Sequence, residues 1–177
     1  PFIALEYVDG RPITEVVAAL PDATRRAETL RLALQMLDAV DHAHRQLVVH
    51  RDLKPSNVLV DAHGQVKLLD FGIAKLLGPG PKQAALTQDL SQLMTPRYAA
   101  PEQISGAAIS TATDVYAAGV LLYELLTGRL PYGSPEATLP QTLHAVMHEP
   151  PAPAGLGPDL DAILARALAK APEQRYA

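Results

Sequence analysis

The chain has 177 residues, 48% of them apolar and 19% charged, and its net charge is −4 at pH 7. This composition supports a hydrophobic core and argues against disorder and against the basic surface typical of nucleic-acid binding. The absence of cysteine excludes disulfides and cysteine-ligated zinc. We expect a cytoplasmic domain, or a large part of one, without membrane contact, because the longest apolar stretch is too short to span a bilayer.

The first part of the chain combines a short strand with helices. A buried strand is predicted over residues 2–5, followed by a turn at residues 10–12. Thr14 is placed to cap a short helix that ends at Leu20, and a longer helix is expected over residues 23–46. The longer helix carries apolar residues at helical spacing, which predict its buried stripe: Leu30, Leu34, Leu37 and Val40.

The rest of the chain reads as a small β region followed by helices. Three β-type runs are expected to form strands, at residues 47–49, 58–60 and 66–69, and residues 61–64 give a hairpin turn signal. Residues 78–92 are rich in turn formers and predict a mobile loop. Three helices are expected beyond it, at residues 112–127, 139–148 and 160–170. The first of these, capped by Ser110 or Thr111 and closed by Gly128, is apolar on nearly every side and should be central and buried.

A polar motif at residues 50–57, with the sequence HRDLKPSN, lies between two of the expected strands. Asp52 can accept a proton from an attacking hydroxyl group. Lys54 can neutralise charge on a phosphoryl group in transfer, and Asn57 offers a neutral oxygen ligand for Mg²⁺. The motif therefore combines, within eight residues, groups that handle phosphate and metal.

A second motif, Asp-Phe-Gly at residues 70–72, follows the last expected strand. The hairpin signal at residues 61–64 lies near the midpoint between Asp52 and Asp70. A hairpin there would return the chain and bring the two carboxylates to one edge of the β region. Two carboxylates at one edge are suited to a Mg²⁺-dependent phosphoryl-transfer site.

A third motif, Ala-Pro-Glu at residues 100–102, follows the segment Thr-Pro-Arg-Tyr at residues 95–98. In this order the three motifs resemble the signature of the protein kinases, and the resemblance extends over residues 2–176. Two further segments resemble bacterial kinases of the eukaryotic type in particular, at residues 68–75 and 123–128.

The resemblance implies a partial protein kinase catalytic domain over residues 1–177, beginning at the hinge. The fold would be mainly α with a small β patch, α+β overall, corresponding to the C-terminal lobe with the N-terminal lobe absent. Residues 1–10 would form the hinge, 50–57 the catalytic loop and 70–102 the activation segment. The implied cofactors are ATP and Mg²⁺, and the implied partners are the missing N-terminal lobe in cis and a protein substrate that carries Ser or Thr. Alone, the chain would be inactive and prone to aggregation.

The resemblance also implies a nucleotide site. Glu6 and Val8 would bind the adenine edge through the backbone C=O and N–H, with Leu5 as the gatekeeper and Leu59 as the floor. Two residues would hold Mg²⁺ beside the phosphates: Asn57 and Asp70.

The remaining implied roles are catalytic and structural. Asp52 would be the catalytic base and Lys54 the contact to the γ-phosphate. Asp114 would hold the catalytic loop through its backbone. Glu102 would pair with Arg175 and tie the activation segment to the lobe.

Regulation is implied by Arg51, which directly precedes Asp52. An arginine there can hold a phosphate on the activation segment through charge-assisted hydrogen bonds. The candidate acceptors are Thr87, Ser91 and Thr95, and the first two are favoured because Thr95 matches a threonine that contacts both the base and Lys54 in the Ser/Thr class. Lys54 itself resembles the Ser/Thr class of kinases.

Two other readings compete with a protein kinase. A pseudokinase would bind nucleotide or act as a scaffold, and the intact Asp52, Asn57 and Asp70 argue against it. A small-molecule phosphotransferase of related fold would generally lack the Ala-Pro-Glu segment. His42 and His44 do not predict a metal pair, because residues two apart on a helix point in different directions.

Overall fold

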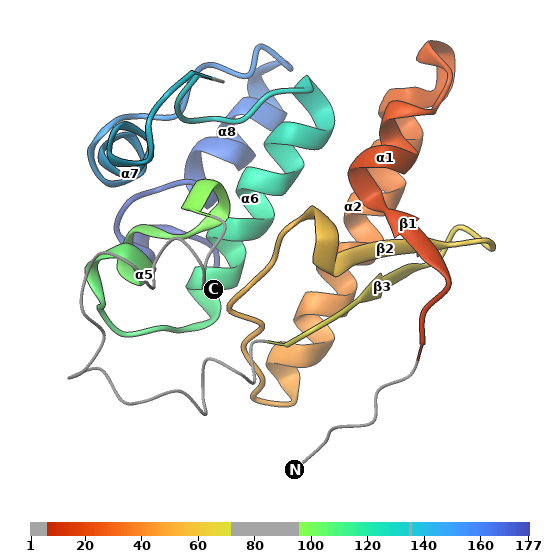
Figure 1. The fold of residues 1–177 in the computed structure, drawn as a ribbon, viewed down its shortest axis with the longest axis horizontal. Helices are drawn as coiled ribbons and strands as arrows, with labels where there is room; N and C mark the ends of the chain where they lie inside the picture. Colours follow the sequence, from red (N-terminus) through yellow and green to blue (C-terminus); the bar gives the residue numbers. More distant parts are fainter. Residues whose placement is uncertain (1–6, 72–95, 135) are drawn as a thin grey trace.

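The computed structural model describes residues 7–71, 96–134 and 136–177 (Figure 1). It is mainly helical with one small sheet, so the expected α+β class is confirmed. The elements in chain order are β1 (Gly10–Pro12), α1 (Ile13–Ala18), α2 (Asp22–Arg45), β2 (Val58–Asp61), β3 (Val66–Leu68), α5 (Pro101–Ser105), α6 (Thr111–Thr127), α7 (Leu139–His148) and α8 (Pro158–Ala167), with 3-10 turns at Pro55–Asn57, Pro96–Tyr98 and Pro172–Gln174.

The sheet is antiparallel with the strand order β1-β2-β3. The predicted hairpin joins β2 to β3, and the carboxylate of Asp61 closes its turn by accepting the backbone N–H groups of His63 and Gln65 at 2.8 and 2.9 Å. The predicted turn at residues 10–12 is wrong, because this segment pairs with β2 as an edge strand. Pro12 is compatible with that position, since an edge strand has a side on which no N–H donor is needed.

The strand predicted over residues 47–49 is also wrong, because this segment ends α2 instead. Leu47 has a φ of 60° and is 93% exposed. Its N–H donates to the carbonyl of His44, and the N–H of Val48 donates to that of Ala43. This pair of bonds around a left-handed residue is a Schellman motif, in which helix termination overrides the β-type composition.

The buried face of α2 differs from the predicted stripe. Leu34 is 61% exposed and Leu37 is also exposed, whereas Val40 is buried as expected. The buried positions share the same helical spacing but include small and polar side chains: Thr29, Leu32, Ala33, Met36, Val40 and Ala43. Leucine occurs on both sides of this helix, so the helical spacing of these residues predicted Val40 correctly but placed Leu34 and Leu37 on the wrong face.

Helix starts differ from the predictions where proline is present. The short first helix begins at Ile13, directly after Pro12, so Thr14 is not its cap. The last helix, α8, begins at Pro158 instead of residue 160 and ends at Ala167. Proline in the first turn of a helix loses no hydrogen bond and has a suitable φ, which explains the early start of α8.

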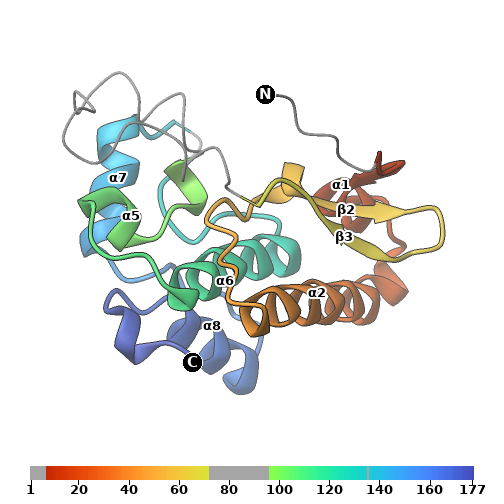
Figure 2. The same cartoon turned by 90° about the horizontal axis from the view of Figure 1, so that it is seen from below.

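Helix α6 is central, as predicted, and it has the predicted ends, with Ser110 before it and Gly128 in the left-handed region after it. It lies between α2 with the sheet on one side and α7 with α8 on the other (Figures 1 and 2). One core cluster joins α6 to α1, α2 and β2 through residues such as Leu121, and a second joins it to α7 and α8 through residues such as Val120. The core therefore fixes α6 from both sides.

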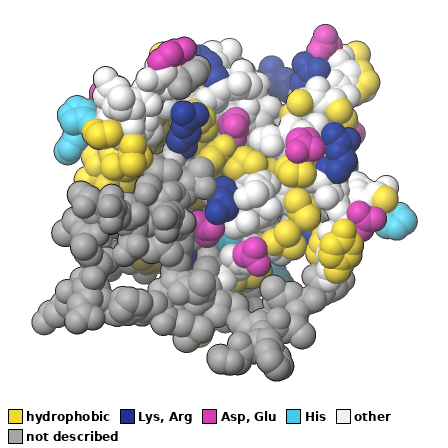
Figure 3. All heavy atoms as spheres, viewed as in Figure 1, with side chains coloured by type: hydrophobic (Ala, Val, Ile, Leu, Met, Phe, Trp, Pro, Cys, Tyr) yellow, Lys and Arg dark blue, Asp and Glu magenta, His cyan; other side chains and the backbone are white. Residues whose placement is uncertain are grey.

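No helix in the described part of the chain is long and apolar enough to cross a membrane. Among the described residues visible in Figure 3, basic and acidic side chains are interspersed.

The tight packing of Gly119 in α6 against the end of α8 can be tested. A Cβ atom on Gly119 would lie 2.9 Å from the Cβ of Ala167 and 3.3 Å from a methyl carbon of Leu168. We expect Gly119→Val to lower the free energy of unfolding by about 1–3 kcal/mol through overpacking. Urea denaturation followed by circular dichroism measures the effect. The exposed Ala27→Val on α2 is the control, and an equal loss in both variants would contradict tight α6–α8 packing.

Candidate active site

The site is built on Asp114, in the first turn of α6. Its carboxylate is 1% exposed and accepts two backbone N–H groups, from His50 at 2.7 Å and from Arg51 at 2.8 Å. Arg51 has a φ of 67°, a left-handed conformation that is uncommon outside glycine. The carboxylate therefore helps to hold the unusual backbone that directs the chain into Asp52.

His44 completes the support of this carboxylate and has no role predicted from the sequence. It lies in the last turn of α2, and its Nε2 is 2.8 Å from Oδ2 of Asp114. The two residues are 70 positions apart in the chain, so no local pattern points to their contact. Helix α2, helix α6 and the loop at residues 50–57 meet at this one carboxylate.

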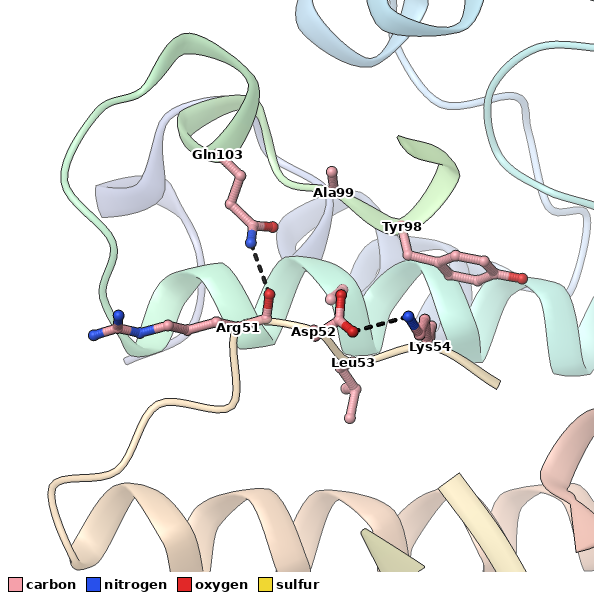
Figure 4. Close-up of a pocket in the computed structure, with 8 residues that line it drawn as sticks. Arg51, Asp52, Leu53, Lys54, Tyr98, Ala99 and Gln103 are labelled. Carbon is pink, nitrogen blue, oxygen red and sulfur yellow. Dashed lines mark hydrogen bonds and ion pairs between the residues drawn. The ribbon is translucent and has the colours of Figure 1, made fainter. Parts of the chain in front are cut away.

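Three of the predicted catalytic residues are in direct contact. The Asn57 side-chain amide donates to the carbonyl of Asp52 at 2.9 Å and to its carboxylate at 3.2 Å. The ammonium of Lys54 lies 2.9 Å from the same carboxylate (Figure 4). Because the nitrogen of the Asn57 amide points to Asp52, its oxygen is the atom suited to a metal ion.

The hairpin brings the backbone of Leu69, the residue before Asp70, next to this group. Leu69 donates its N–H to the carbonyl of Asn57 at 2.9 Å, and its own carbonyl is 2.9 Å from Nε2 of His50. Asp70 itself is exposed, with a φ of 50°. The backbone just before Asp70 is therefore fixed by two residues of the 50–57 motif.

His50 is a buried packing residue, as expected. Its ring lies 4.8 Å from the ring of Phe71, which links the two motifs. Burial lowers the pKa of His50 below its usual value, although the charge of Asp114 and the carbonyl of Leu69 act in the opposite direction. The imidazole is therefore neutral at neutral pH and serves as packing and as a hydrogen-bond partner.

A pocket beside Asp52 is lined by the catalytic motif, by the 3-10 turn at Pro96–Tyr98 and by α5 (Figure 4). Tyr98 stands on one side of it and donates its hydroxyl to Glu124 of α6 at 2.7 Å. Burial, together with the hydrogen bond to Glu124 and its charge, raises the pKa of Tyr98, so the hydroxyl remains a donor.

A buried ion pair fixes α5. The guanidinium of Arg175 donates to both carboxylate oxygens of Glu102, at 2.7 and 2.9 Å, and the two residues are 3% and 4% exposed. Thr113 donates to the same carboxylate at 2.8 Å. The remaining donors of Arg175 bind three backbone carbonyls, those of Ala112, Ala169 and Lys170. All five guanidinium donors are therefore used.

The protonation of Glu102 follows from this setting. Burial alone would raise its pKa, but the hydrogen bonds from Arg175 and Thr113 and the charge of Arg175 outweigh burial, so that the pKa lies below its usual value. Glu102 is therefore ionised at neutral pH.

The residues predicted for nucleotide binding are described in part. Leu59 lies on β2 between Val58 and Val60, which are buried in the core, so its side chain is on the opposite face of the sheet. Val8 is half-buried in the segment before β1. The other predicted binding and regulatory residues lie outside the described residues: Leu5, Glu6, Thr87, Ser91 and Thr95, as does the predicted loop at residues 78–92.

The donor set suits a hard cation. Within the described ranges, no three His, Asp or Glu side chains come together as a metal site. The amide oxygen of Asn57 and the carboxylate of Asp70 are both oxygen ligands, and Mg²⁺ is commonly held by one or two protein oxygens together with phosphate oxygens and water. These residues therefore fit Mg²⁺ bound to a polyphosphate.

The fold is α+β, and the site brings a carboxylate, an ammonium and an amide into contact at Asp52, Lys54 and Asn57, which are groups of the kinds used in Mg²⁺-dependent phosphoryl transfer. The chain belongs to the protein kinase domain family, whose model matches residues 2–177. This confirms the resemblance stated from the motifs.

Three of the similar proteins are kinases from bacteria. A probable serine/threonine-protein kinase of Streptomyces coelicolor is 39% identical over 99% of this chain, which covers 26% of that protein. The probable kinase PknB of Bifidobacterium longum is 36% identical over 100% of the chain and 26% of its own length, and pkn3 of Myxococcus xanthus is 38% identical over 99% and 34%. The chain therefore spans about a quarter to a third of these relatives.

The ion pair at Glu102 predicts a pH-dependent stability. The pKa of Glu102 is lower in the folded protein than in the unfolded chain. The ionised side chain therefore stabilises the fold fully above its pKa in the unfolded chain, and this stabilisation is lost as the pH falls through its pKa in the folded protein. We expect Glu102→Gln to cost about 3–5 kcal/mol at pH 7, with a smaller difference from the unsubstituted protein below about pH 4. Urea unfolding at several pH values measures this. A constant difference, or an equal one for the exposed Glu173→Gln, would contradict the assignment.

Proposed function

We propose that the chain is the C-terminal lobe of a serine/threonine protein kinase that transfers the γ-phosphate of ATP to a Ser or Thr hydroxyl of a protein. The observation that carries the proposal is the contact of Asp52 with Asn57 and Lys54, together with the attachment of Leu69 to Asn57 just before Asp70. The names of the relatives support it, and they do not favour the pseudokinase alternative.

In this proposal the segments have the roles that the resemblance implies. The hinge is at residues 1–10, the catalytic loop at 50–57 and the activation segment at 70–102. The half-buried side chain of Leu59 lies on the face of the sheet away from the core, which supports its role as the floor of the adenine site. The N-terminal lobe would complete the nucleotide site from the other side.

The reaction is an in-line displacement at phosphorus. The acceptor hydroxyl oxygen forms a bond to the γ-phosphorus while the bond to the departing ADP oxygen breaks, and Asp52 takes the hydroxyl proton. Asn57 orients that carboxylate through the 3.2 Å hydrogen bond, and Lys54 moves its charge toward the transferring group. Asn57 and Asp70 would hold Mg²⁺, which supplies charge neutralisation for the phosphates.

A protein acceptor is favoured over a small molecule by the anchoring of the Ala-Pro-Glu segment. The pair of Glu102 and Arg175 fixes α5, which together with Tyr98 lines the pocket at Asp52. A fixed platform beside the base can position an extended peptide. Lys54 supports Ser or Thr as the acceptor, because it resembles the lysine of the Ser/Thr class.

Removal of the base tests this function in the full-length protein. We expect Asp52→Asn to lower kcat by about 10²–10⁴-fold while ATP binding is retained, because a general base contributes about that factor. Transfer of labelled γ-phosphate, with identification of the modified amino acid, measures the activity. The exposed Asp159→Asn should remain active. Equal activity of the two variants, or phosphate found only on tyrosine, would refute the proposal.

A second prediction concerns activation. We propose that Thr87 or Ser91 carries a regulatory phosphate that Arg51 binds. If so, Arg51→Ala and the double variant Thr87→Ala/Ser91→Ala should each reduce kcat, and their combination should reduce it no further, because both remove the same interaction. Mass spectrometry of the active protein checks the modification. Full activity with both hydroxyls unmodified would contradict this proposal.

A further inference from the structure

We propose that Gln103 of α5 is a positioning residue for the catalytic base, through which the anchored end of the activation segment holds the backbone that enters Asp52. The proposal rests on the kinase function proposed above. It assigns to Gln103 a role in the reaction rate without contact to the reacting groups.

The amide of Gln103 has two different partners. Its nitrogen donates to the backbone carbonyl of Arg51 at 2.8 Å (Figure 4), and its oxygen accepts the backbone N–H of Ala100 at 3.0 Å. The second bond closes the start of α5, and the first reaches 52 residues back along the chain to the catalytic loop. Because the amide oxygen is bonded within α5, the amide nitrogen is held in a position from which it donates to the loop.

The carbonyl that accepts this bond belongs to a strained residue. Arg51 has a φ of 67°, a left-handed conformation that is unfavourable for a non-glycine residue and persists only where the surroundings hold it. Its N–H is held by Asp114 at 2.8 Å and its C=O by Gln103 at 2.8 Å. Side chains from two separate helices therefore hold both polar atoms of this residue, and its carbonyl carbon is bonded directly to the nitrogen of Asp52.

The support behind Gln103 is rigid. Its neighbour Glu102 is fixed by Arg175 and Thr113, so α5 cannot shift without breaking a buried ion pair. A side chain at position 103 needs both an acceptor for Ala100 and a donor for Arg51. Glutamine has both, whereas glutamate has only the acceptor when ionised.

The substitution Gln103→Glu separates these two bonds. It preserves the shape and the acceptor for Ala100 but removes the donor to Arg51 and places a carboxylate oxygen beside a carbonyl. In the full-length protein we expect kcat to fall about tenfold, as for the loss of one hydrogen bond, with the KM for ATP unchanged. Gln103→Met, which removes both bonds without adding charge, should show at least the same loss of kcat.

The matched control is Gln141→Glu. Gln141 occupies the same position in the first turn of α7, where its oxygen accepts the backbone N–H of Thr138 at 2.8 Å. The chemical change and the local helix-start role are therefore the same, but the hydrogen bonds of Gln141 go to Thr138 at its own helix start and not to the catalytic loop. This variant should keep the kcat of the unsubstituted protein.

Amide hydrogen exchange provides a readout that does not require kinase activity. We expect exchange in a peptide covering residues 50–54 to be several-fold faster in Gln103→Glu than in Gln141→Glu, since the loop has lost the hydrogen bond from position 103 to the carbonyl of Arg51. If the unsubstituted protein transferred no phosphate, the proposed function would fail while exchange still tested Gln103. A kcat and an exchange rate in Gln103→Glu equal to those of the control would overturn the inference.

Discussion

The arrangement of the site depends on one buried carboxylate. Asp114 is almost completely shielded from water, and a carboxylate in that setting is costly unless hydrogen bonds satisfy it. It has the N–H groups of His50 and Arg51 and the imidazole of His44 as partners, and it lies in the first turn of α6, where the helix dipole favours a negative charge. Since both core clusters pack on α6, the catalytic loop acquires the rigidity of the core.

Two consecutive residues at the start of α6 hold two different parts of the site. Asp114 holds the catalytic loop, while Thr113 donates to Glu102 and so holds α5. The hydrogen bond from Gln103 to the carbonyl of Arg51 then joins α5 to the loop. The helix start, α5 and the loop form a closed set of contacts, so a displacement of any one of them has to be accommodated by the other two.

The sequence predicted the elements that carry strong local signals, and it failed where an unusual residue takes a local role or where distant contacts decide. The ends of α6 were predictable because Ser110 and Gly128 are themselves helix-end signals, and the hairpin was predictable from its turn residues. The strand expected at residues 47–49 failed because Leu47 takes a left-handed conformation to end α2, a role usually taken by glycine. Of the site, the motifs indicated the polar residues, but not His44 or Gln103, whose partners lie 70 and 52 positions away.

The strengths of the contacts differ between the supports and the reacting groups. The side chains of Lys54 and Asp52 are 24% and 20% exposed, so solvent screens this ion pair more than the almost fully buried pair of Glu102 with Arg175. Breaking a buried pair such as Glu102 with Arg175 costs about 3–5 kcal/mol. In the proposed mechanism, Lys54 can therefore move from Asp52 to a phosphate more easily than Arg175 can leave Glu102, because an ammonium on a flexible stem has three donors and no fixed direction. The buried pair would stay in place during this movement, so the carboxylate of Asp52 would remain oriented while the charge beside it rearranges.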